Sequence, residues 1–171
     1  MNRLPKAVVR RAFYRATQGG FTLIEMLVTV MIVLVLASVA LPMTELASQR
    51  DKEQQLRRSL REIREALDAY KQAGDEGKIA RKALDSGYPP SLEALTEGVP
   101  DVHSTSGAKF YFIRRIPRDP FVTDPEVPAA RTWGRRSYAS SGEDPKPGSD
   151  VYDVYSTSTA VGMNGIPYRE W

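Results

Sequence analysis

Residues 20–42 read GFTLIEMLVTVMIVLVLASVALP, and the apolar run within this stretch, Phe21 to Leu41, decides the fold. Its 21 residues contain a single ionisable side chain, that of Glu25. An α-helix rises about 1.5 Å per residue, so the run forms a helix roughly 30 Å long, which matches the hydrocarbon core of a bilayer. We therefore predict a helix that spans a membrane once.

The segment before the run carries the excess basic charge of the chain. Residues 1–20 contain no acidic residue and five basic ones, namely Arg3, Lys6, Arg10, Arg11 and Arg15. Basic residues that flank a membrane span are retained on the cytoplasmic side. This predicts a cytoplasmic N-terminus and a C-terminal region on the periplasmic side of the inner membrane. From residue 21 onward 19 basic residues face 21 acidic ones. The pI of about 9.2 therefore comes from the leading segment and does not indicate nucleic-acid binding.

After Pro42 the apolar residues thin to one stripe on a charged background. The stripe has spacings of 4, 3, 4 and 3 residues and consists of Leu56, Leu60, Ile63, Leu67 and Tyr70. This period predicts that the helix continues beyond the membrane with one buried face. Gly74 predicts an end near Ala73. Pro42 removes one backbone hydrogen bond and predicts a bend.

The C-terminal region predicts a small sheet. Thr132–Ala139 and Val151–Thr157 are rich in aromatic and β-branched residues and flank a turn-forming segment, so we expect an antiparallel pair. A last short strand is expected around Ile166–Tyr168, and Ser91 is expected to cap a short helix that Gly98 closes. Packing of this sheet against the long helix gives an α+β fold. The expected organisation is a leader over residues 1–20, a membrane helix over 21–42, an amphipathic helix over 43–73 and a globular region over 74–171.

Glu25 requires a partner, because an unpaired carboxylate in an apolar span costs several kcal/mol. The chain supplies one if it is cut between Gly20 and Phe21. The new α-amino group would lie four residues before Glu25 and carry the opposite charge at the same membrane depth. Within one helix this pair forms locally, and between neighbouring helices it sets the axial register of an assembly.

A basic leader precedes, and Pro42 follows, a stretch that begins with the string GFTLIEM at residues 20–26. This arrangement resembles the prepilin leader of type IV pilins and type II secretion pseudopilins. The resemblance implies a pilin-like fold, in which one long N-terminal helix packs on a small antiparallel C-terminal sheet. It also implies cleavage after Gly20 by the prepilin peptidase and N-methylation of Phe21 by the same enzyme. Glu25 would pair with the N-terminus of a neighbouring subunit during polymerisation.

Short blocks in the C-terminal region narrow the resemblance. They are Tyr88-Pro89-Pro90 before Leu92-Glu93-Ala94-Leu95, Ile116-Pro117-Arg118-Asp119-Pro120-Phe121, Trp133-Gly134, Ser137-Tyr138 and Tyr152-Asp153-Val154-Tyr155-Ser156. Their order is similar to that of the major, G-type pseudopilin of type II secretion. This likeness implies a homo-oligomeric periplasmic filament that helps to export folded proteins. Its implied partners are other pseudopilins and the inner-membrane secretion platform.

The calcium-binding loop of that family is not matched here. Residues 156–171 read STSTAVGMNGIPYREW and contain one carboxylate, that of Glu170. Calcium takes about six to eight oxygen ligands, which this segment would have to supply from carbonyls and hydroxyls. We therefore expect no cofactor.

Three other interpretations of the apolar run stay open. A type IV pilus minor pilin, serving adhesion, motility or DNA uptake, would carry the same leader. A plain signal anchor would hold a periplasmic module that never polymerises. An ordinary secretory signal would find a small-residue cleavage site at Ser38-Val39-Ala40, although its apolar region is usually only about 7 to 15 residues long.

No other group of side chains predicts catalysis or metal binding. The single histidine, His103, lies in a Ser- and Thr-rich segment, and there is no cysteine. Arg135 and Arg136 are expected to give a strand a charged edge that discourages stray pairing. We expect a protein that is not an enzyme. Two acidic groups are expected to form surface turns, with no metal: Asp119, Asp124 and Glu126, and Asp144, Asp150 and Asp153.

Overall fold

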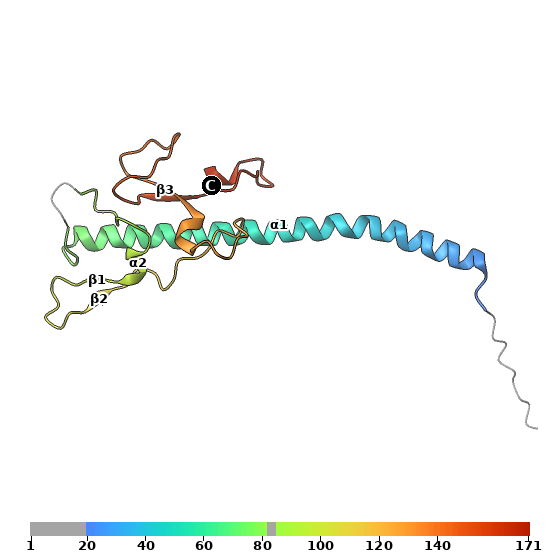
Figure 1. Ribbon diagram of the computed structural model, residues 1–171, viewed down its shortest axis with the longest axis horizontal. Helices are drawn as coiled ribbons and strands as arrows, with labels where there is room; N and C mark the ends of the chain where they lie inside the picture. Colours follow the sequence, from blue (N-terminus) through green and yellow to red (C-terminus); the bar gives the residue numbers. More distant parts are fainter. Residues whose placement is uncertain (1–19, 82–84) are drawn as a thin grey trace, which may run out of the picture. The chain divides into compact units, whose positions relative to one another are not determined.

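The computed structural model describes residues 20–81 and 85–171, and over residues 39–43 it describes the backbone alone. The contacts divide the chain into two units between Met43 and Thr44. A long helix and two small antiparallel strand pairs confirm the predicted α+β fold (Figure 1). The elements are α1 (Leu23–Asp75), α2 (Ala94–Glu97), β1 (Val99–Pro100), β2 (Lys109–Phe110), η1 (Ala129–Thr132), β3 (Trp133–Arg136), β4 (Asp153–Ser156) and η2 (Tyr168–Glu170).

Helix α1 begins where Thr22 caps it. The Thr22 hydroxyl accepts a hydrogen bond from the Glu25 N–H at 3.2 Å, and the Thr22 carbonyl accepts one from the Met26 N–H at 3.1 Å. A threonine at the cap position has non-helical backbone angles, so the helix begins after it and not at Phe21 as predicted. Glu25 therefore lies in the first turn, where the helix dipole favours a negative charge.

The end of α1 corrects a prediction. Gly74 lies inside the helix, which continues to Asp75, so Gly74 is not the stop. The stop is Gly77, whose φ of 72° is the left-handed conformation that glycine adopts without strain. Lys78 donates to the Ala73 carbonyl at 2.9 Å and Gly77 donates to the Gly74 carbonyl at 3.1 Å. This pair of bonds is the Schellman motif, which satisfies the last helical carbonyls.

The predicted stripe on α1 forms the core of the second unit. Its first four members, Leu56, Leu60, Ile63 and Leu67, are at most 2% exposed, and Tyr70 is partly buried. Burial of such a side chain contributes about 1.5–3 kcal/mol relative to leaving it in water. The buried partners that pack on this stripe are Leu92, Leu95, Ile113, Trp133, Val151, Val154 and Tyr168.

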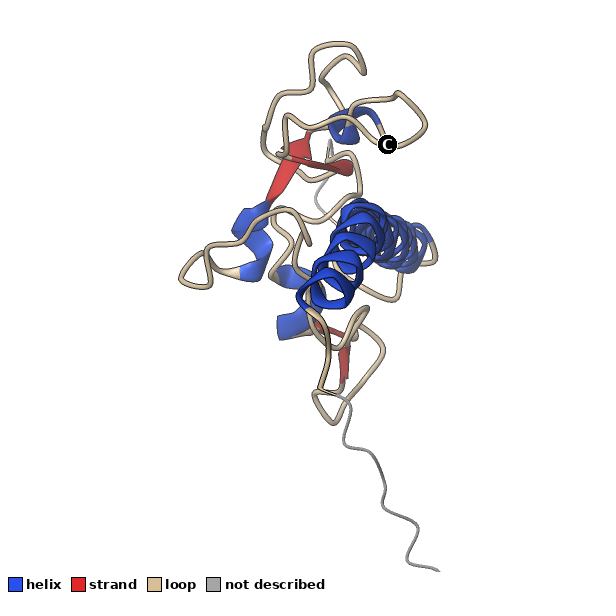
Figure 2. Cartoon of the chain, turned by 90° about the vertical axis from the view of Figure 1, so that its right-hand side faces the viewer, coloured by secondary structure: helices blue, strands red, loops and turns tan. Residues whose placement is uncertain are grey.

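The two strand pairs lie on opposite sides of the part of α1 that belongs to the second unit (Figures 1 and 2). Strands β3 and β4 are antiparallel, with Trp133 opposite Ser156 and Arg136 opposite Asp153. This pairing confirms the predicted pair, although each strand is shorter than expected. The β1 and β2 pair was not predicted, because two-residue strands show no periodicity.

The predicted cap of the short helix is wrong. Helix α2 begins at Ala94 after Glu93, without a side-chain cap, so Ser91 does not start it. Gly98 does end it, with a φ of 82°.

The predicted last strand is also wrong. One isolated bridge joins Val161 to Pro167, and Tyr168 starts the 3-10 helix η2. Proline donates no backbone hydrogen bond, which limits pairing at this point.

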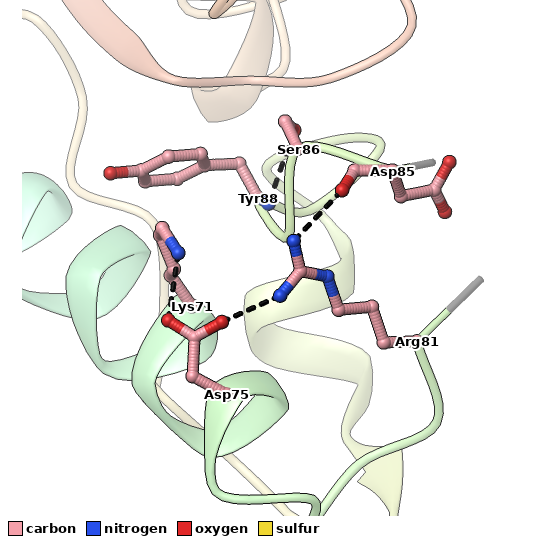
Figure 3. Close-up of polar contacts among 6 residues, drawn as sticks. All are labelled: Lys71, Asp75, Arg81, Asp85, Ser86 and Tyr88. Carbon is pink, nitrogen blue, oxygen red and sulfur yellow. Dashed lines mark hydrogen bonds and ion pairs between the residues drawn. The ribbon is translucent and has the colours of Figure 1, made fainter. Parts of the chain in front are cut away.

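Charged side chains connect the end of α1 to the following loop (Figure 3). The Asp75 carboxylate accepts from Lys71 Nζ at 2.7 Å and from Arg81 Nη1 at 2.6 Å. Arg81 Nη2 also donates to the main-chain oxygen of Asp85 at 3.0 Å. The hydrogen bond from Lys71 lowers the pKa of the Asp75 carboxyl.

Candidate functional site

The predicted processing junction lies at the start of α1. Gly20 is exposed, with open space around the position of a Cβ atom, and Phe21 is 77% exposed. Glu25 is exposed as well, and every ion pair within residues 20–81 and 85–171 lies elsewhere. The junction is therefore accessible to an enzyme, and the Glu25 carboxylate is available to a group from another molecule.

The apolar side chains that follow the junction are exposed in the single chain. Leu23 is 84% exposed, Met31 64% and Leu36 66%. A contiguous apolar surface of this size requires lipid or a neighbouring molecule to cover it.

Within the part of the chain that the structure describes, no helix combines the length and the apolar character needed to cross a membrane.

Two of the predicted features lie at least partly outside the described residues. The leader covers residues 1–20, and Gly20 is its only described residue. The predicted span covers residues 21–42, and the side chains of residues 39–43 are not described. The backbone of α1 is helical through Pro42. The membrane span and the bend at Pro42 stay predictions.

A buried carboxylate that was not predicted joins the C-terminal tail to α1. Glu53 is 8% exposed, and its Oε1 accepts from the Met163 N–H at 2.8 Å, the Tyr168 hydroxyl at 2.9 Å and Gln49 Nε2 at 3.3 Å. Burial raises the pKa of the Tyr168 hydroxyl; a hydrogen bond with Gln49 opposes the rise and the Glu53 carboxylate adds to it. The signal for Glu53 was its spacing, because it lies three residues before Leu56 and continues the apolar stripe.

The tail itself uses its oxygens in local turns. Asn164 Oδ1 accepts from the Ile166 N–H at 3.1 Å, and Ser158 Oγ accepts from the Ala160 N–H at 3.3 Å. The tail turns hydrogen-bond donors toward Glu53, whereas a calcium ion would need oxygen ligands there. Among the described residues no three His, Cys, Asp or Glu side chains are grouped to hold a metal ion. This arrangement does not fit a calcium site.

Asp119 belongs to the core and not to a surface turn. It is 1% exposed, and its carboxylate accepts from the Ser156 hydroxyl at 2.6 Å and from the Phe121 N–H at 2.9 Å. The prediction for Asp119 is therefore wrong, because one of its two partners, Ser156, comes from a strand distant in sequence. Asp124 and Glu126 are exposed, as predicted.

Asp150 also holds the structure together. Its carboxylate accepts from the Ser137 hydroxyl at 2.5 Å, from the Tyr138 N–H at 3.0 Å and from the Ser86 hydroxyl. Burial by itself raises the pKa of Asp150, but these hydrogen bonds outweigh burial and leave the pKa below its ordinary value. The prediction that Asp150 lies in a surface turn is therefore wrong.

Asp153 pairs with α1, which also differs from the expected surface turn. Arg64 Nε donates to Asp153 Oδ1 at 2.7 Å, and Arg64 Nη2 donates to the main-chain oxygens of Val154 at 3.2 Å and Trp171 at 2.9 Å. One guanidinium thus joins α1, β4 and the tail. Asp144 is exposed, as predicted.

The two adjacent arginines of β3 differ in their surroundings. Arg135 is exposed, which agrees with a charged edge. Arg136 is partly buried, and its guanidinium lies over the Tyr152 ring, 4.8 Å from the centroid. The Tyr152 ring contacts those of Tyr88 and Tyr138 at 5.0 and 5.4 Å. Arg136 therefore covers an aromatic cluster, and the expectation of a charged edge is wrong for it.

Comparisons with known proteins agree with this arrangement. The model of the prokaryotic N-terminal methylation motif matches residues 15–41, which include the junction and Glu25. Type II secretion system core protein G of Klebsiella michiganensis is 32% identical over 143 residues, which cover 80% of this chain and 91% of that protein. The chain belongs to the type II secretion system core protein G family.

Two further core protein G sequences support the assignment. The protein from Klebsiella pneumoniae is 30% identical, covering 78% of this chain and 90% of its own length. The protein from Pectobacterium carotovorum subsp. carotovorum is 28% identical, covering 78% and 81%. No solved structure matches the chain significantly. The chain is therefore a pseudopilin of a type II secretion system, which confirms the function implied by the resemblance and favours it over a minor pilin.

Proposed function

We propose that this pseudopilin is made as a precursor that prepilin peptidase cleaves between Gly20 and Phe21 and then methylates at the new N-terminus. The methylation motif that matches residues 15–41 supports this proposal. So does the exposure of both junction residues ahead of the first helical turn. A protease needs an accessible backbone, and a glycine before the cut leaves it unobstructed.

The subunit is stored in the inner membrane with its N-terminus in the cytoplasm and its C-terminal domain in the periplasm. The basic residues of the leader favour the cytoplasmic side. The exposed apolar face of α1 needs lipid until it finds another helix.

Assembly transfers α1 from lipid to a bundle of like helices. Lipid tails are as apolar as leucine, so the transfer gains little hydrophobic energy, and packing and polar pairing decide the register. Glu25 is the observation that carries this step: it is the one ionisable side chain of the apolar run and has no ion-pair partner within the described residues. Its partner is the α-amino group of Phe21 on a neighbouring subunit. Head-to-tail repetition without closure gives a filament.

The filament works with other pseudopilins and with the inner-membrane secretion platform, and its growth helps to export folded proteins. Its role is structural and not enzymatic. In support, the single histidine, His103, is exposed on a loop, and only its main-chain N–H is seen to donate a hydrogen bond, to Asp101 Oδ1. The attachment of the tail to α1 needs no metal ion in this proposal, because Glu53 holds the tail by direct hydrogen bonds.

The proposal is tested on the full-length protein in a strain that lacks its own copy. Mass spectrometry of the native protein is expected to find methylated Phe21 at the N-terminus, and Gly20→Asp is expected to abolish this product. Glu25→Ala is expected to be cleaved normally but to lose filaments and secretion. Glu45→Ala, which removes another exposed glutamate of α1, is the matched control and is expected to retain both. Native protein that keeps residues 1–20, or a normal filament yield from Glu25→Ala, would refute the proposal.

A further inference from the structure

A pocket of about 330 Å³ lies between α1 and the C-terminal tail, wholly within the second unit. Three arginines of α1, at spacings of 4 and 3 residues, form one wall: Arg57, Arg61 and Arg64. Apolar side chains of the tail and of α1 form the rest, among them Leu60, Ile166 and Trp171. The pocket thus combines positive charge with an apolar wall.

The three guanidinium groups are not equivalent. Arg64 is occupied by Asp153 and by main-chain oxygens. Arg57 lies over the Trp171 ring at 4.3 Å, which orients it without supplying an acceptor. Arg61 is exposed and has no hydrogen bond or ion pair to any described residue. Two guanidinium groups therefore face the pocket with their hydrogen-bond donors free.

The surrounding charge favours one further anion. Arg64 is already paired with Asp153, and although Glu170 also lines the pocket, no carboxylate of a described residue forms an ion pair with Arg57 or Arg61. An arginine fork binds a carboxylate through two parallel hydrogen bonds. A fitting ligand therefore presents a carboxylate next to a small apolar group, as an acidic loop of a protein does.

The chain itself carries such a loop on another part of its surface. Asp124 and Glu126 are exposed, and neither side chain has an ion pair among the described residues. Arg118 donates to the main-chain oxygens of Asp124, at 2.5 Å, and Val127, and the Glu126 N–H donates to Asp124 Oδ1 at 3.0 Å. These bonds fix the backbone of the loop before it meets a partner, which lowers the entropy cost of binding.

We propose that the pocket between α1 and the tail receives the Asp124–Glu126 loop of a second copy of this chain. The loop and the pocket are different surfaces, so the contact is heterologous, which is the type that propagates into an open filament. The charges are complementary, and the apolar wall accommodates the valine that follows Glu126 in the loop. This inference rests on the proposed function, because it adds a second register-setting contact to a filament of this subunit.

The test measures sedimentable filaments of the full-length protein in the strain that lacks its own copy. Arg61→Glu and Asp124→Arg are each expected to lower the filament yield about fivefold. The double variant is expected to restore the yield, because it re-forms the ion pair with the two charges exchanged. Arg58→Glu is the matched control: it makes the same charge change on an exposed residue of α1 that does not line the pocket. Total protein level and resistance to protease check that each variant folds.

Each outcome decides a different point. A yield for Arg61→Glu equal to that for Arg58→Glu overturns the pocket as a contact. Loss in Arg61→Glu with a normal yield in Asp124→Arg overturns the loop as the occupant, as does a double variant that stays defective. If the unaltered protein forms no filaments at all, the proposed function is overturned, and the contact that rests on it is overturned too.

Discussion

Glu53 is the residue whose removal tests the fold most directly. Its carboxylate is the acceptor for the Met163 N–H and the Tyr168 hydroxyl, and it sits on the buried face of α1. Glu53→Ala leaves these two donors without their acceptor. Glu53→Gln keeps an oxygen in place but removes the charge.

The size of the effect follows from these two hydrogen bonds. A hydrogen bond to a charged group contributes about 1.5–3 kcal/mol, and a buried donor left unpaired costs a similar amount. Because Met163 is 43% exposed, water can replace part of the lost hydrogen bonding, and we expect Glu53→Ala to lower the free energy of unfolding by about 3 kcal/mol. We expect about 1 kcal/mol for Glu53→Gln, since a neutral acceptor is about half as strong.

The assay is denaturant unfolding of the full-length protein in detergent micelles, followed by tryptophan fluorescence. Trp133 is 3% exposed and therefore reports loss of the core. Glu62→Ala removes an exposed glutamate of the same helix and is expected to change stability by less than about 0.5 kcal/mol. A chelator is expected to leave the unfolding curve of the unaltered protein unchanged. If Glu53→Ala matched the Glu62→Ala control, or if the chelator alone destabilised the protein, Glu53 would not be the anchor of the tail.

Two other predictions use the same unfolding measurement. Hydrogen bonds keep the pKa of Asp150 below its ordinary value of 3.8, so its contribution is present above that pH and is lost as the pH falls through the lower folded pKa. Asp150→Asn is therefore expected to be less stable than the unaltered protein at neutral pH, with a gap that closes in acid; a gap independent of pH contradicts this. Gly77→Ala is expected to cost about 1 kcal/mol because φ is 72°, whereas Gly74→Ala, inside the helix, is expected to be neutral or stabilising. Equal effects at the two glycines would contradict the assigned helix end.

The features that the sequence predicted well are those written in local periodicity. The stripe from Leu56 to Tyr70 repeats at helical spacing, and its members do form the core. The β3 and β4 pair was visible because aromatic and β-branched residues flank a turn-rich segment. The string at residues 20–26 indicated a prepilin-like N-terminus because it is contiguous in sequence, and the methylation-motif model matches it.

The failures share a different cause, which is that the deciding partner lies far away in sequence. Asp119 is buried because Ser156 reaches it from β4, and its neighbours in sequence carry no sign of this. The choice between Gly74 and Gly77 depends on which residue takes the left-handed conformation, and composition does not distinguish them. Glu53 is the exception among the missed residues. Its position in the apolar stripe could have predicted a buried glutamate, which needs hydrogen-bond donors.

Two glutamates of α1 connect the fold with the proposed assembly. Glu53 lies among apolar side chains, and the tail of the same chain supplies its donors, so its requirement is met when the second unit folds. Glu25 lies in an apolar run too, yet the described part of the chain supplies no cation for it. A carboxylate without a partner is costly in an apolar environment, so under the proposed function the same physical rule that fixes the tail through Glu53 predicts a neighbouring subunit at Glu25. Substitution at Glu53 should therefore reduce stability at any protein concentration, whereas substitution at Glu25 should leave the fold intact and affect only the assembled state.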